Sequence, residues 1–292
     1  MSVIDIKLAP LVLSKASRTV TKPQGVGGKL LRRPTFVLSV LILGFWVAAP
    51  VVLAFLGLDG LNRTGGVNQP PGGGHPFGTD NLGRDVFIRT LAGAGPILTI
   101  APAATAIATV VGAAMGLAAG YFRGIVDDLL MRSFDILHAL PGIIAILLVT
   151  AAFGRSPVTI MIAIGIFFAP IIARTVRSAV FVETGKQYVE SARSQGESTW
   201  RILFVELLPN VAPTLIVEAT IRLGFAVFAS AGLSFLGLGA QPPSPDWGLV
   251  VSQNRIFIQT AWWSVTFPAL AIMTLVVAVN LIADNLREVL QS

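Results

Sequence analysis

Six stretches of the chain contain no Asp, Glu, Lys or Arg over at least 18 consecutive residues. They are Pro34–Leu58, Thr90–Phe122, Ile136–Gly154, Ser156–Ala173, Leu223–Pro245 and Ile256–Ala283. A bilayer core is about 30 Å thick, an apolar helix needs about 20 residues to cross it, and a charge at its centre is costly. Only 12% of the residues are charged, too few to cover a soluble protein of this kind. We therefore expect an all-α polytopic membrane protein with six transmembrane helices.

The charges between these stretches predict the orientation of the chain. The first 33 residues hold seven basic residues and one acid, Asp5, without the apolar core of a cleaved signal peptide. The positive-inside rule then places residues 1–34 in the cytoplasm as a basic tail, and six spans in 35–292 return the C-terminus to the same side. On this topology 15 Lys and Arg residues are cytoplasmic and five are external.

The same pattern predicts the bounds of the spans and loops. The loops are external at 59–92 and 237–263, and the longest cytoplasmic loop covers 183–211, while Gly120–Ser133 forms a short internal loop. The six spans are expected at Thr35–Leu58, Gly93–Ala119, Phe134–Phe153, Val158 to about Phe181, Ala212–Leu236 and Ser264–Ile282.

The second span carries small residues four apart, a spacing that places them on one helix face. They are Ala104, Ala108, Gly112, Gly116 and Gly120. Small residues let the backbones of membrane helices approach closely. We expect this face to pack against another helix, of this chain or of a partner.

The 183–211 loop predicts two short helices that meet at an angle. A helix-forming run ends at Gly196, which suits the left-handed position after a helix, and Ser198 can cap the next helix. Pro209 is expected to end that second helix. Its apolar residues have helical spacing and can lie on the protein itself, on lipid or in the groove of a partner; they are Trp200, Leu203, Phe204, Leu207 and Leu208.

This loop resembles the "EAA" loop of ABC-importer membrane subunits. Glu190-Ser191-Ala192, then Gly196 and Leu208-Pro209, match that pattern, with Ser191 in place of the first Ala and Glu206 in place of Ile. Collinear segments over roughly residues 75–290 resemble the dipeptide/oligopeptide and nickel permease family, second-permease-subunit type. These segments are Phe77–Val86, Gly120–Asp127, Met131–Asp135 with Leu140-Pro141, Gly232–Gly239, and Gln241–Pro243 with Asp246–Gly248. Relatives often carry an acid where this chain has Ser230.

The resemblance implies a type I ABC importer permease fold in a prokaryotic cell membrane. The chain would form a heterodimer with a homologous permease subunit, with two cytoplasmic ATPase subunits and an external substrate-binding protein as further partners. ATP and Mg would bind the ATPases only, because this chain has no phosphate-binding loop motif. We therefore expect this chain to have no enzyme activity and to bind no cofactor. The residues implied to couple the chain to the ATPases are Glu190, Ala192, Gly196, Trp200, Leu208 and Pro209.

Other charged residues have a functional and a structural interpretation. Glu218 and Arg222, four apart in the fifth span, either line the translocation path or form a structural ion pair, and we favour the second. Asp80, Arg84 and Asp85 either dock the external binding protein or hold their own loop. With no cysteine and only His75 and His138, a metal site is not expected.

The favoured function is a permease for di- or oligopeptides. A permease for nickel-chelate or another small solute shares the same motifs. An intramembrane enzyme lacks a recognisable catalytic motif here, and a passive scaffold does not account for the 190–209 loop. We attribute the net charge of +6 to the basic residues that set the orientation in the membrane, and not to binding of a nucleic acid.

Overall fold

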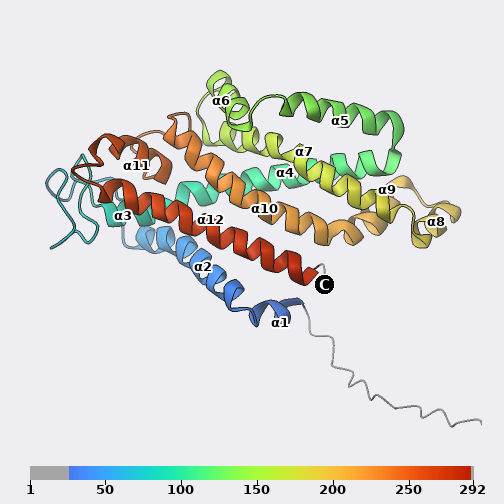
Figure 1. Ribbon diagram of the computed structural model, residues 1–292, viewed down its shortest axis with the longest axis horizontal. Helices are drawn as coiled ribbons and strands as arrows, with labels where there is room; N and C mark the ends of the chain where they lie inside the picture. The colour runs from blue at the N-terminus through green and yellow to red at the C-terminus, as the bar shows by residue number, and fades with distance from the viewer. Residues whose placement is uncertain (1–25, 291–292) are drawn as a thin grey trace, which may run out of the picture.

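The computed structural model describes residues 26–290 of the 292-residue chain, and within this range the regular structure is helical apart from three isolated β-bridges between residues 63 and 85. The long helices run along one axis (Figure 1). In chain order the elements are α1 (Val26–Leu31), α2 (Pro34–Phe55), α3 (Val86–Ala92), α4 (Ala94–Phe122), α5 (Gly124–His138), α6 (Gly142–Phe153), α7 (Pro157–Glu183), α8 (Gln187–Ser194), α9 (Thr199–Arg201), the π-helix η1 (Ile202–Leu207), α10 (Leu208–Phe235), α11 (Trp247–Asn254), the 3₁₀-helix η2 (Arg255–Phe257) and α12 (Trp263–Leu290). Most of the predicted basic tail lies outside the described residues.

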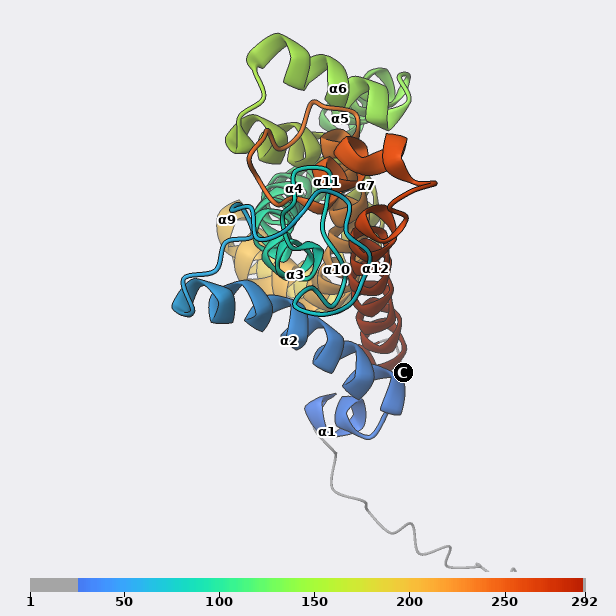
Figure 2. The same ribbon diagram turned by 90° about the vertical axis from the view of Figure 1, so that its left-hand side faces the viewer.

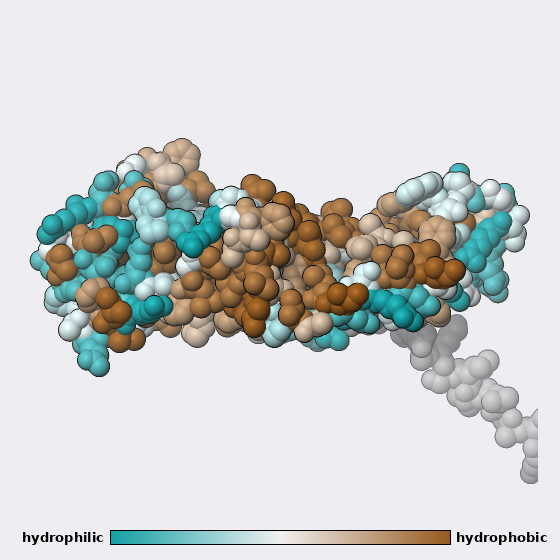
Figure 3. Space-filling view, turned by 90° about the horizontal axis from the view of Figure 1, so that it is seen from above, coloured by the Kyte–Doolittle hydropathy of each residue, from teal (hydrophilic) through white to brown (hydrophobic). Residues whose placement is uncertain are grey.

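The helices have the length and composition of membrane spans. Five are long and apolar enough to cross a bilayer, and the pair α5 and α6 makes a sixth if it is counted as one bent span. Figure 3 shows a hydrophobic middle section between two hydrophilic ends. We call these the α8 end, with α8 and α9, and the α11 end, with α11 and the 59–85 loop. The chain is therefore an all-α multi-pass membrane protein.

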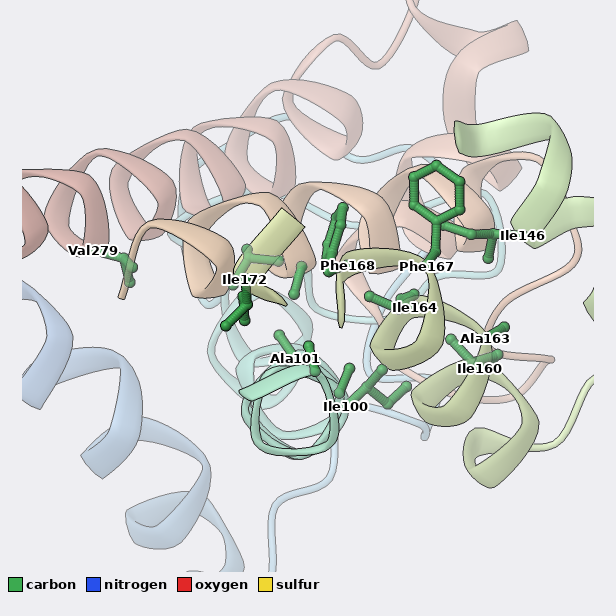
Figure 4. Close-up of a cluster of buried hydrophobic side chains, with 14 of the residues drawn as sticks. Ile100, Ala101, Ile146, Ile160, Ala163, Ile164, Phe167, Phe168, Ile172 and Val279 are labelled. Atoms are coloured by element: carbon green, nitrogen blue, oxygen red, sulfur yellow. The ribbon is translucent and has the colours of Figure 1, made fainter. Parts of the chain in front are cut away.

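The centre of the bundle is the contact between α4 and α7. The row of small residues on α4 faces α7 of the same chain: a Cβ at Gly112 would lie 2.7 Å from the carbonyl oxygen of Ala169, and one at Gly116 2.6 Å from that of Ala173. Beside this contact, Ile164, Phe168 and Ile172 of α7 pack into the main hydrophobic core (Figure 4). Seen along the long axis, α2 and α6 lie on opposite sides of these central helices (Figure 2).

The third span is not the single straight helix that the sequence predicted. The chain breaks at residues 139–141, and α5 and α6 meet at 85°. Pro141 explains the break, because proline has no N–H for a helix interior and disfavours helical backbone at the residue before it. The predicted 120–133 loop is also wrong, since α5 already begins at Gly124. Asp127 and Asp135 lie on this helix and pair with α7.

The second helix of the 183–211 loop does not end at Pro209 as predicted. The helix continues from Thr199 to Phe235 through η1, and Pro209 lies in the first turn of α10. A π-helix pairs each carbonyl with the N–H five residues on, so the N–H that Pro209 lacks does not interrupt the helix. The 183–211 segment therefore runs into the fifth span without a flexible link.

The last helix extends beyond the predicted end at Ile282. Asn285 of α12 donates a 3.2 Å hydrogen bond to the hydroxyl of Thr35, and Glu288 forms an ion pair with Arg33. These contacts fasten the start of α2 to the end of α12 at the α8 end.

Replacing Gly116 with alanine tests the α4–α7 contact. The new methyl group would meet a backbone oxygen, so the helices must separate, and we expect unfolding in detergent at a lower temperature, with a loss of about 1–3 kcal/mol. Gly44 of α2 is the matched control, because a Cβ there has no atom within 4 Å. Equal melting temperatures for Gly116→Ala and Gly44→Ala would contradict the packing argument.

Candidate functional site

The α8 end carries a rigid corner made of α8, Gly196 and the next helix. Gly196 has a φ of 74°, its N–H donates to Arg193 O, and the N–H of Glu197 donates to Ala192 O at 3.1 Å. This pair of bonds is the Schellman arrangement, which favours glycine at the left-handed position. The Ser198 hydroxyl then accepts the N–H of Arg201 at 3.4 Å. Both sequence predictions for this corner, the end at Gly196 and the cap at Ser198, are confirmed.

One face of the corner is part of the protein core. Val189, Ala192 and Leu207 are buried in the main hydrophobic cluster, together with Ile202 and Leu203. The Tyr188 hydroxyl donates a 2.7 Å hydrogen bond to Glu183 at the end of α7. Burial, together with this bond, raises the pKa of Tyr188 above its ordinary value. The corner is therefore fixed to α7 and α10 rather than loosely attached.

The opposite face is exposed and contains aromatic and charged groups. Trp200 is 71% exposed and stacks on Phe204, with ring centroids 5.5 Å apart. Glu190 and Pro209 are also exposed, whereas Leu208 is partly buried. Of the predicted coupling residues, Ala192 and Leu208 thus support the fold, and the others lie on the open surface. An exposed stacked aromatic pair among charges is typical of a protein-docking surface.

At the α11 end, the acidic and basic residues singled out in the sequence are buried, not exposed. Asp80 is 0% exposed; its carboxylate accepts Arg84 Nε at 2.7 Å and lies 3.4 Å from Arg89 Nε. Asp85 caps α3 and pairs with His75 at 2.8 Å. These side chains hold the 59–92 loop together, and they are not presented to a soluble partner.

Long-range contacts join this loop to the 237–263 loop. The sequence alone did not predict them. Arg89 donates to the carbonyls of Gly60 and Ser244, and the indole N–H of Trp263 donates to Thr79 O at 3.0 Å. The indole of Trp247, fully buried, donates to Thr90 O at 2.6 Å. Trp263 is itself buried, at 6% exposed.

Glu218 and Arg222 form the predicted ion pair inside α10. Arg222 Nε lies 2.8 Å from Glu218 Oε1, and the side chains are 16% and 13% exposed, respectively. The guanidinium also lies 4.9 Å from the ring of Phe225. The two charges therefore neutralise each other within one helix, and both side chains remain partly accessible at the surface of this chain.

Comparison with known proteins places the chain in a family. Residues 108–291 match the family described as binding-protein-dependent transport system inner membrane component. The chain belongs to this family.

Relatives with assigned names agree with this family. The dipeptide transport system permease protein DppC of Alkalihalophilus pseudofirmus is 42% identical over 76% of this chain and 73% of its own length. The glutathione transport system permease protein GsiD of Pectobacterium atrosepticum is 37% identical over 87% of this chain and 84% of its own. A putative peptide transport system permease protein of Brucella suis is 37% identical over 99% of this chain and 94% of its own.

The family match covers the α8 corner and the fifth and sixth spans but not the buried charges of the 59–92 loop. The chain is thus a membrane component of a binding-protein-dependent transport system, and its helices are those of an importer permease. The 59–92 network lies before the matched residues.

Replacing Asp80 with asparagine tests the buried network. Two guanidinium groups would then share a buried site without a counter-charge, and breaking a buried ion pair typically costs about 3–5 kcal/mol. We expect faster proteolysis of the 59–92 loop in the folded protein. Asp59→Asn, at an exposed position of the same loop, is the control, and equal proteolysis rates would argue against the network.

The stability of the α11 end should depend on the protonation of Asp246. Burial raises the pKa of this α11-capping carboxyl to about 6, from an ordinary value of 3.8. Because the folded protein binds this proton more tightly, the group contributes increasing stability as pH falls from 7 through 6, with no further gain below about 3.8. Thermal unfolding of Asp246→Asn, which keeps a capping oxygen, should lack this component; an unchanged pH profile would contradict it.

Proposed function

We propose that this protein is a permease subunit of an ATP-driven ABC importer that carries peptides into a prokaryotic cell. It forms half of the translocation pathway, pairs with a homologous permease subunit as a heterodimer, and binds no cofactor and no ATP itself. Two ATPase subunits dock at the α8 end, and a substrate-binding protein docks at the α11 end.

The observation that carries the coupling role is the exposed Trp200–Phe204 stack on a corner fixed into the bundle. Trp200 lies in the first turn of the helix that runs from Thr199 to Phe235, so a partner that moves the corner also moves the fifth span. Glu190 and Arg193, exposed on α8, add charges of both signs to this end of the molecule. A soluble ATPase surface with a groove for an aromatic pair is the partner that this chemistry favours.

The charge distribution supports the orientation with the α8 end in the cytoplasm. The α8 end carries basic side chains on α7, α8 and the end of α12, such as Arg177, Arg193 and Arg287, whereas the α11 end has few. The starts of α1 and α2 lie at the same end as the end of α12. Both termini are then cytoplasmic, in the plasma (inner) membrane.

The printed names of the relatives support a peptide substrate. Dipeptide, glutathione and peptide transport are named for proteins aligned with most of this chain. We expect the substrate-binding protein to be the first to select peptide length and side chains. A permease for a nickel chelate is the alternative to test in parallel.

Uptake measurements separate these substrates. A strain deleted for this gene should lose growth on di- or tripeptides as the only source of an essential amino acid, and regain it with the gene restored. Normal peptide growth of the deletion strain together with lost nickel-chelate uptake would replace the peptide proposal with its alternative.

Replacing Trp200 and Phe204 with alanine tests docking of the ATPase. Aromatic hot-spot residues typically contribute about 2 kcal/mol or more to an interface, so the double variant should lose most of the ATPase recovered with the tagged permease. The control is Trp262→Ala, a half-exposed tryptophan at the opposite end. Full ATPase recovery with the double variant, inserted and folded, would count against this surface.

A further inference from the structure

A cavity of about 480 Å³ opens between α7 and α10 in the half of the bundle nearest the α8 end. It is lined by Arg174, Thr175, Ser178, Ala179, Val182 and Thr214. Its volume is within the usual range for small-molecule sites. Four of its six lining residues carry a polar side chain, a larger share than in the cavities between α2 and the bundle or beside α11.

The charged groups beside the cavity lie deep along their helices. Arg174 is nine residues before the end of α7, and its partner Asp135 is eleven residues after the start of α5, or about 14 and 17 Å along the helices. Glu218 follows Thr214 by one helical turn on α10, on the same face. The polar strip thus continues from the cavity toward the middle of the bundle.

These groups are exposed where lipid would be an unfavourable neighbour. The Arg174 and Asp135 side chains, joined at 2.8 Å, remain 42% and 73% exposed. Ionisable side chains within a membrane face protein or water rather than lipid. The α5–α6 break adds a second constraint, because Leu140 and Pro141 are exposed and irregular backbone at membrane depth must face protein or water. Water and the substrate path therefore fit this face better than lipid.

We propose that this cavity is the water-filled cytoplasmic vestibule of the translocation pathway, and that the Arg174–Asp135 ion pair closes its α5 side. The inference rests on the proposed importer function and deepens it by assigning pathway residues. Asp135 is held by a single partner at the surface of α5, so a small movement of α5 against α7 opens that side. The substrate meets Ser178, Thr214 and then the cytoplasm.

Thiol labelling in the assembled importer tests the vestibule without relying on transport. The chain has no cysteine, so single cysteines can be introduced in its natural background. Maleimides react with the thiolate, which forms in water and not in lipid. In membranes open at both faces, a charged, membrane-impermeant maleimide should label Ser178→Cys and Thr214→Cys several-fold faster than Val40→Cys. Val40 is half-exposed on α2, the candidate span with the highest hydropathy. Arg287→Cys, exposed near the end of α12 and outside the proposed docking corner, is the positive control.

The closing role of the ion pair is tested in the same assay. Asp135→Asn should increase the labelling rate of Ser178→Cys several-fold, and Asp128→Asn, two helical turns away on α5, should not. Labelling of Ser178→Cys as slow as Val40→Cys in both backgrounds would overturn the vestibule, whatever the substrate is. Fast labelling without an effect of Asp135→Asn would overturn the closing role. Fast labelling in a protein that imports no peptide would support the vestibule and contradict the proposed peptide substrate.

Discussion

The close contact between α4 and α7 determines how the other helices can be placed. Lipid offers no hydrophobic gain for bringing two apolar helices together, so their association depends on packing. Glycines on both helices make that packing close: Gly112 and Gly116 face backbone oxygens of α7, and Gly165 of α7 meets Ile107 and Ala104 of α4. The core side chains of α6, α10 and α12 then pack around this pair. The bundle is thus built around a contact in which an added methyl group would meet backbone atoms of the neighbouring helix.

Several charged side chains occur in compensated pairs, and the exposure of each pair indicates its surroundings. Asp80 and Arg84 are almost fully buried, which is the environment of a structural network. Arg174 and Asp135 have the same chemistry at greater exposure, on a face with interrupted backbone. In our proposal, the structural pair and the pathway pair therefore differ in their exposure and their place along the helices rather than in residue type.

Of the six spans expected from the sequence, five are single apolar helices. These spans and the Gly196–Ser198 corner could be predicted because they depend on local rules of length, charge and capping. The two prolines show where local rules fail. Pro141 breaks its span, whereas Pro209 is absorbed in the first turn of α10 after a π-helix, and nothing near either residue distinguishes them in advance. The burial of Arg89 and Trp247 also could not be predicted, because their partners are Ser244 and Thr90, about 155 residues away in the chain.

The continuous helix from Thr199 to Phe235 has a mechanical consequence. Its 37 residues amount to a rod of about 55 Å, longer than a bilayer core is thick. At one tip stands the exposed Trp200, and at the other Phe235 lies beside α11 at the opposite membrane face. If a partner tilts this helix at Trp200, the helix turns about its contact with α4 and α7, and its Phe235 end moves as well because no break separates the two ends. A single helix can thus transmit one movement to both faces of the membrane.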